Sequence, residues 1–168
     1  MPEQDTLKRA KRDKRQGKSP TTQAGEFVRE EMHHVREGKH GARSAKQAIA
    51  IGLSKARRAG VNLRRPPASA KPSTKRSAAS ASRSARRGRK KPSARRSRAV
   101  RNALRREPRR AASRQALSKQ AKQSARRRPR SARRAAAGRA VRTKGARVRR
   151  EAARRAARTR QRRRRHAA

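Results

Sequence analysis

Residues 44–60 read SAKQAIAIGLSKARRAG, and this stretch has the clearest helical pattern in the chain. Its apolar residues recur at three- and four-residue steps, which places them on one face of a helix. Ser44 followed by Gln47 has the form of a capping box, which satisfies backbone N–H groups at a helix start. Gly60 can take the left-handed conformation that ends a helix. The pattern predicts a helix that begins near Ser44 and ends near Gly60.

A second apolar stripe precedes this helix. Ser19 can cap it, with Pro20 at the first helical position, and Gly38 can end it. The short connection from Gly38 to Arg43 is typical of antiparallel helix pairs, so we expect a helical hairpin over residues 19–63. The residues expected to pack it are Phe27, Val28, Met32, Val35, Ile49, Leu53 and Ala56.

Because the hairpin has so few large apolar side chains, we expect its folding stability to be marginal. A second copy of the chain or a nucleic acid could make the hairpin rigid, so a homodimer through the hairpin is one expectation. Residues 1–18 offer almost nothing to bury, and we expect them to form a frayed basic N-terminal arm.

Charge is distributed unevenly along the 168 residues. Lys and Arg total 57 against 9 acidic residues, a net charge of +48, and only 30% of the chain is hydrophobic. Residues 1–63 hold 15 basic and 7 acidic side chains, whereas residues 64–168 hold 42 and 2. Self-repulsion of this size opposes a compact state. We therefore expect a mostly disordered chain with α-helical segments: the short N-terminal hairpin, then a long disordered basic tail of low complexity at residues 64–168.

Arginine dominates this predicted tail, with 35 Arg against 7 Lys. A guanidinium can hold a phosphate through two parallel hydrogen bonds and stays charged at physiological pH. The tetrapeptide Ser-Ala-Arg-Arg recurs at irregular spacing, which indicates a compositional bias rather than a structural repeat. Prolines 92, 108 and 129 divide the tail into pieces, which could become helical once phosphates neutralise them.

The composition predicts a DNA-binding protein that neutralises phosphates without reading bases. The candidate nucleic-acid-binding residues are runs of neighbouring basic side chains in the tail. They are Arg86, Arg87, Arg89, Lys90, Lys91, Arg95, Arg96, Arg126, Arg127, Arg128, Arg133, Arg134, Arg149, Arg150, Arg154, Arg155, Arg162, Arg163, Arg164 and Arg165.

Residues 86–92 read RRGRKKP and resemble an AT-hook, in which an extended Arg-Gly-Arg core lies in the minor groove of A·T-rich DNA. That core has proline on both sides, whereas here Arg86 and Lys90 stand there. Unselective phosphate binding is therefore the favoured interpretation, ahead of minor-groove selectivity.

No metal ligands are assigned. Glu-x-x-His occurs at Glu30/His33 and at Glu31/His34, but both copies share one helical turn, and residues 44–59 add no carboxylate. The favoured interpretation is an exposed helix surface with Glu30 paired to His34 and His33 paired to Glu37.

Catalysis is not expected either, because so small a core cannot wall a pocket, and we predict no cofactor and no small-molecule substrate. The chain has no cysteine and no apolar run long enough for a membrane span. We expect a cytoplasmic, nucleoid-associated protein.

Residues 25–60 resemble a small bacterial domain family of unknown function, whose signature KQAIAIxLSxARxAG matches Lys46 to Gly60. Members are sometimes labelled plasmid-stabilisation proteins. The tail is similar in composition to bacterial histone-H1-like proteins and to protamines. These resemblances imply DNA compaction, in the nucleoid or in plasmid maintenance, and imply no catalytic residue.

Two alternatives to DNA compaction stay open. The first is RNA binding, because a phosphate-seeking tail without aromatic residues for base stacking hardly distinguishes the two nucleic acids. The second is an interaction adaptor, in which the hairpin docks a protein and the tail acts as an electrostatic tether.

Overall fold

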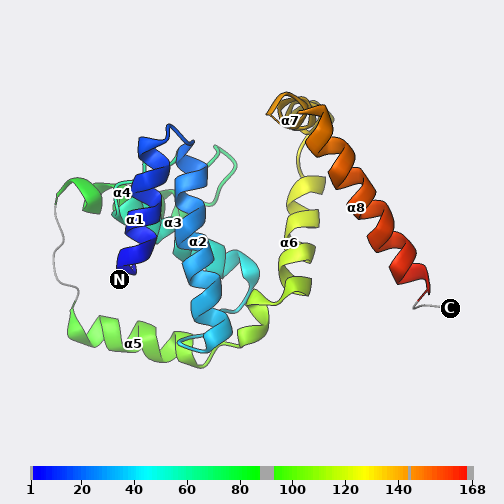
Figure 1. Cartoon of the computed structure of the whole chain (residues 1–168). Helices are drawn as coiled ribbons and strands as arrows, with labels where there is room; N and C mark the ends of the chain where they lie inside the picture. The colour runs from blue at the N-terminus through cyan, green and yellow to red at the C-terminus, as the bar shows by residue number, and fades with distance from the viewer. Residues whose placement is uncertain (1, 88–92, 144, 166–168) are drawn as a thin grey trace. The chain divides into compact units, whose positions relative to one another are not determined.

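The computed structural model describes residues 2–87, 93–143 and 145–165, and the side chains of Thr143, Arg163 and Arg164 lie outside this description. Within these ranges the backbone forms eight α-helices and one short 3-10 helix, η1 (Figure 1). They are α1 (Gln4–Arg15), α2 (Pro20–Glu37), α3 (Ala45–Arg58), α4 (Pro72–Arg86), α5 (Ala94–Arg105), η1 (Arg109–Ala112), α6 (Arg114–Arg126), α7 (Arg130–Thr143) and α8 (Ala146–Arg165).

Helices α2 and α3 form the expected hairpin, and the caps predicted at its two helix starts are confirmed. The Ser19 hydroxyl accepts a hydrogen bond from the Thr22 N–H at 3.4 Å, and the Ser44 hydroxyl accepts one from the Gln47 N–H at 3.3 Å. The capping box is incomplete, however. The Gln47 side chain accepts from the Arg43 N–H at 2.7 Å instead of the Ser44 N–H.

The two hairpin helices cross very closely at Gly52. A Cβ atom there would lie 2.8 Å from the Cα atom of Val28, a separation that real side chains do not show. Glycine at this position therefore lets the backbones of α2 and α3 approach each other. The other buried residues of α3 are alanines, whose small side chains also allow the two helices to pack at short distance.

Helix α1 packs along α2 and differs from the frayed arm expected at residues 1–18 (Figure 1). Ala10 is 6% exposed and packs in a cluster with Ala24, Phe27 and Ala56. Arg9 adds an ion pair to α2, because its Nε lies 2.7 Å from Glu26 Oε2. The small side chain of Ala10 lets α1 pack closely against α2.

Residues 104–112 close the core on the other side of the hairpin. The Gly41 N–H donates to the Leu104 carbonyl at 2.8 Å, and the Ala42 N–H donates to the Pro108 carbonyl at 3.2 Å. Ala111 and Ala112 are 4% and 0% exposed. They pack in a cluster with residues 32, 35, 42 and 48 of the hairpin. A segment far along the chain thus supplies part of the N-terminal core.

The prediction of a mostly disordered chain with a long disordered tail at residues 64–168 is wrong, because 77% of the described residues are helical. Alanine and arginine are both strong helix formers, and this preference outweighs the repulsion between neighbouring charges. Prolines also stand where helices begin rather than inside them. Pro72 is the first residue of α4, and Pro129 directly precedes α7.

The chain divides into two units, at residues 1–120 and residues 121–168. Both clusters of buried apolar residues belong to the first unit. The second unit holds the end of α6 together with α7 and α8, and none of its described residues is buried. The helices of the second unit therefore present nearly all of their side chains to solvent.

Candidate functional site

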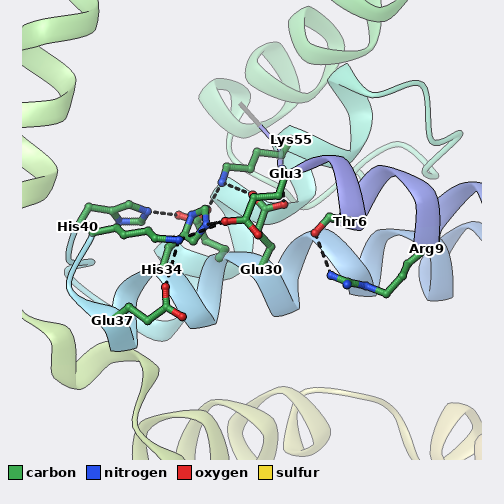
Figure 2. Close-up of polar contacts among 10 residues, drawn as sticks. Glu3, Thr6, Arg9, Glu30, His34, Glu37, His40 and Lys55 are labelled. Carbon is green, nitrogen blue, oxygen red and sulfur yellow. Dashed lines mark hydrogen bonds and ion pairs between the residues drawn. The ribbon is translucent and has the colours of Figure 1, made fainter.

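The first unit gathers charged and imidazole side chains from α1, α2, α3 and the loop after α2 (Figure 2). We call this group the acid–histidine cluster. Its members are Glu3, Glu30, Glu31, His34, Glu37, Lys39, His40 and Lys55.

Lys55 is the central cation of the acid–histidine cluster. Its Nζ lies 2.9 Å from Glu30 Oε1 and 2.8 Å from Glu31 Oε2, and these carboxylates are 1% and 0% exposed. Burial by itself would lower the pKa of Lys55, but the adjacent carboxylates of Glu31 and Glu30 together raise it above the usual 10.5. Burial likewise works to raise the pKa of Glu30, yet the bonds from Lys55 and the Glu3 backbone hold it below 4.5.

Glu3 joins the start of α1 to α2. Its backbone N–H donates to Glu30 Oε2 at 3.0 Å, and its carboxylate accepts from His34 Nε2 at 2.9 Å and from Lys39 Nζ at 3.2 Å. Hydrogen bonds from His34 and then from Lys39 lower the pKa of Glu3 to about 2. Ionised Glu3 is therefore strongly favoured in the folded chain.

His40 and Glu31 meet at the end of the acid–histidine cluster next to the loop. His40 Nδ1 donates to the Gly41 carbonyl at 3.0 Å, and His40 Nε2 lies 3.2 Å from Glu31 Oε1. Neither oxygen of Glu31 makes an aligned hydrogen bond, although both face a nitrogen. The ring of His34 stands edge-on to that of His40, with centroids 6.0 Å apart.

The expected surface pairs of Glu30 with His34 and of His33 with Glu37 are absent from the contacts of these described residues. Glu30 bonds Lys55, His34 bonds Glu3, and Glu37 bonds Lys39. The interpretation as an exposed helix surface is wrong for Glu30 and Glu31, which are buried where α1 and α3 pack on α2. His33 and Glu37 are exposed, as expected. Two adjacent glutamates among the apolar positions of α2 were the only hint in the sequence.

The predicted nucleic-acid-binding residues are spread over several helices rather than gathered in one site. Those with described side chains are all exposed. They are Arg86 and Arg87 at the end of α4, Arg95 and Arg96 in α5, Arg126, Arg127 and Arg128 at the end of α6, Arg133 and Arg134 in α7, and Arg149, Arg150, Arg154, Arg155, Arg162 and Arg165 in α8. Arg89, Lys90 and Lys91 lie outside the described residues, as do the side chains of Arg163 and Arg164.

A cationic cleft between residues 57–66 and α4 was not expected. It has a volume of about 550 Å³, and its lining includes five basic side chains: Arg57, Arg65, Lys75, Arg83 and Arg86. Only Arg86 among them was a predicted binding residue. Arg57 donates to the Arg64 carbonyl at 3.0 Å, and Lys75 donates to the Ala68 carbonyl at 2.6 Å. These hydrogen bonds hold the connection between α3 and α4 against the two helices.

The residues expected to pack the hairpin lie inside the first unit. Phe27, Met32, Val35 and Ala56 are buried, between 0% and 7% exposed. The other three are partly buried and pack against the same two clusters: Val28, Ile49 and Leu53.

Comparison of the chain with protein-family models, with curated proteins and with solved structures finds no match. The resemblance of residues 25–60 to a bacterial domain family therefore stays a prediction. In the part of the chain that the structure describes, none of the helices combines the length and the apolar character that crossing a membrane requires.

Proposed function

We propose that this protein binds duplex DNA without sequence preference, by bringing exposed arginines on preformed helices against the phosphates. The observation that carries the proposal is the exposure of the described arginine clusters from α4 to α8. Residues 64–168 hold 42 basic and 2 acidic side chains, so acids within this region can neutralise few of them. A polyanion supplies the missing charge, and a nucleic acid backbone carries it at the needed density.

The length and charge of α8 suit binding to the phosphates of duplex DNA. It has 20 residues, with eleven arginines and one glutamate. A helix of this length spans about 30 Å, and the same length of duplex carries roughly 18 phosphates. An α-helix also fits the width of the major groove, with phosphates on both sides. The eleven arginines and one glutamate of α8 could therefore neutralise roughly half of these phosphates.

Preformed helices also favour binding. A disordered tail loses backbone entropy when it is ordered on DNA, and that loss weakens binding. Helices that exist before contact avoid most of this cost, so more of the electrostatic free energy appears as affinity.

The test neutralises four described arginines of α8 in the full chain: R150Q, R154Q, R155Q and R162Q together. Glutamine keeps the helix propensity and removes the charge. The logarithm of the DNA association constant should then fall less steeply with the logarithm of salt concentration, by about 3 to 4 in slope. The matched control carries lysine at the same four positions and should keep the wild-type slope.

An unchanged slope in the glutamine variant would refute phosphate binding through α8. Competition between duplex DNA and duplex RNA at matched salt tests the choice of nucleic acid, and a preference for RNA would replace DNA as the partner.

Because α1 and η1 cover the apolar faces of the hairpin, we propose that a single chain, and not a dimer, is the unit that binds DNA. Cytoplasmic DNA, in the nucleoid or in a plasmid, is the proposed location of this activity.

A further inference from the structure

We propose that Glu31, His34 and His40 form a zinc site in the acid–histidine cluster, with a water molecule as the fourth ligand. One carboxylate oxygen and one nitrogen from each imidazole lie within 4.8 Å of one another. Two imidazoles and a carboxylate are a ligand set that zinc uses in proteins. The site joins α2, which carries Glu31 and His34, to the loop that carries His40.

The hydrogen bonds around His40 leave a ligand nitrogen facing the buried carboxylate. The Gly41 carbonyl can only accept, so the Nδ1 atom of His40 must carry the proton. In a neutral ring Nε2 then presents its lone pair to Glu31 Oε1, 3.2 Å away. Two facing acceptors repel each other unless a cation lies between them. A backbone carbonyl that orients an imidazole in this way is typical of metal-binding histidines.

His34 is oriented in a comparable way. Its Nε2 faces the carboxylate of Glu3 at 2.9 Å, so this nitrogen donates and Nδ1 keeps the lone pair. A carboxylate behind an imidazole fixes the ring and makes it a stronger ligand. Glu3 and Gly41 thus support one imidazole each.

The distances suit a tetrahedral ion. Zinc ligands about 2.1 Å from the ion lie roughly 3.4 Å apart. His40 Nε2 and Glu31 Oε1, at 3.2 Å, already have this separation. One imidazole nitrogen of His34 lies within 4.8 Å of the other two ligand atoms. Rotation of the His34 side chain would have to bring Nδ1 to roughly 3.4 Å from them.

The local charge also favours a divalent cation. Four carboxylates of the acid–histidine cluster face two lysines, which leaves two negative charges when both histidines are neutral. This is an unusual concentration of acid in a chain of net charge +48. Glu31 is fully buried without an aligned hydrogen bond, so a metal ion would satisfy an oxygen that the protein leaves poorly paired.

Bound zinc would fix the loop between α2 and α3. Residues 104–112 dock on this loop through hydrogen bonds from the Gly41 and Ala42 N–H groups. Zinc should therefore stabilise the docking of this segment, and so the whole first unit.

The experiment uses the full chain, freed of metal with EDTA, and titrates it with zinc chloride by calorimetry. The variant H34Q/H40Q removes both ligand imidazoles, and the matched control H33Q/H166Q removes the other two of the four histidines. His33 is the neighbour of His34 on α2, is exposed, and is outside the ligand set. The ligand variant should bind zinc more than about 100-fold more weakly than wild type, and the control should bind as wild type does.

Equal binding by H34Q/H40Q and wild type, or equal weakening in both variants, would overturn the proposal. A second measurement needs no variant: imidazole nitrogen resonances of the wild-type chain, recorded with and without zinc. Resonances of His34 and His40 should shift, and those of His33 and His166 should not. Absence of a zinc-dependent shift would leave a proton as the cation between His40 and Glu31, and would refute the metal site.

Discussion

Lys55 is the residue on which the buried carboxylates of Glu30 and Glu31 depend. It is the cation within ion-pair distance of both Glu30 and Glu31, which are almost completely buried. The variant K55M keeps the length of the side chain but leaves two carboxylates without this cation. We expect a loss of about 3 kcal/mol in the free energy of unfolding, because an unpaired buried charge is costly. Urea denaturation measures the change.

Lys46 supplies the control for Lys55, because it lies on the same helix α3 and is exposed. K46M should change the free energy of unfolding by no more than about 0.5 kcal/mol. The double variant K55M/E31Q should recover part of the loss, since a neutral amide costs less to bury than a carboxylate. Equal stability of K55M and K46M would contradict the central role of Lys55.

Glu3 makes the attachment of α1 dependent on pH. Its folded pKa of about 2 lies below the ordinary value of 4.5, so the bonds of ionised Glu3 stabilise the fold fully above pH 4.5. This contribution is lost as pH falls from 4.5 through about 2. We expect the Glu3 amide resonance, which reports its bond to Glu30, to shift over that range.

The variant E3Q tests the assignment of this titration, because glutamine has no proton to gain there. The same resonance should lose the change that Glu3 produces. An amide of residue 3 that titrates in E3Q as it does in wild type would point to Glu30 as the responsible group.

Single residues also show what the sequence could and could not predict. The caps at Ser19 and Ser44 depend on neighbours within three residues, so local pattern was enough to find them. The partners of Glu30 and Glu31 come from residue 55 and from the loop at residue 40. No periodicity within α2 specifies such partners, so the local pattern alone predicts a solvated surface at these residues.

At the scale of elements, Gly41 controls whether residues 104–112 can dock on the hairpin. A Cβ atom at Gly41 would overlap the backbone carbonyl of Glu107. We expect G41A to displace this segment and to cost about 1 to 3 kcal/mol in the free energy of unfolding. The amides of Gly41 and Ala42, which bond Leu104 and Pro108, should then exchange hydrogen faster.

Gly25 provides the matched control for Gly41. It lies inside α2, and a Cβ atom there would meet nothing within 4 Å. G25A should therefore be neutral or stabilising by up to about 1 kcal/mol, because alanine favours a helix over glycine. If G41A left the amide exchange of Ala42 at the wild-type rate, docking through this loop would be disproved.

The helices of residues 64–168 were missed for a physical reason. Net charge favours disorder, whereas Ala, Arg, Gln and Lys are all among the better helix formers, and in this chain the helix propensity prevails. The prolines predict breaks between disordered pieces, but in the structure Pro72 is the first residue of α4 and Pro108 precedes η1. The docking of Ala111 and Ala112 could not be predicted, because two alanines among arginines carry no sign of burial.

At the scale of the whole molecule, the division of the chain sets where it can be cut. All residues that the structure places in the two apolar clusters precede residue 121, and residues 129–168 hold 17 of the 57 Lys and Arg residues. We expect a chain of residues 1–128 to keep a cooperative thermal transition close to that of the full protein. Its affinity for DNA should fall less steeply with salt than that of the full chain, because fewer phosphates are neutralised.

A chain of residues 1–63 is the informative contrast, because it lacks Ala111 and Ala112 and should melt at much lower temperature. Loss of DNA binding in that short chain could come from unfolding or from loss of charge, whereas the chain of residues 1–128 separates the two effects.

Circular dichroism of the full protein should already show high helicity without DNA, and added DNA should raise it little, since 77% of the described residues are helical. A large helical gain on DNA, or the same salt dependence with and without residues 129–168, would contradict binding through preformed basic helices.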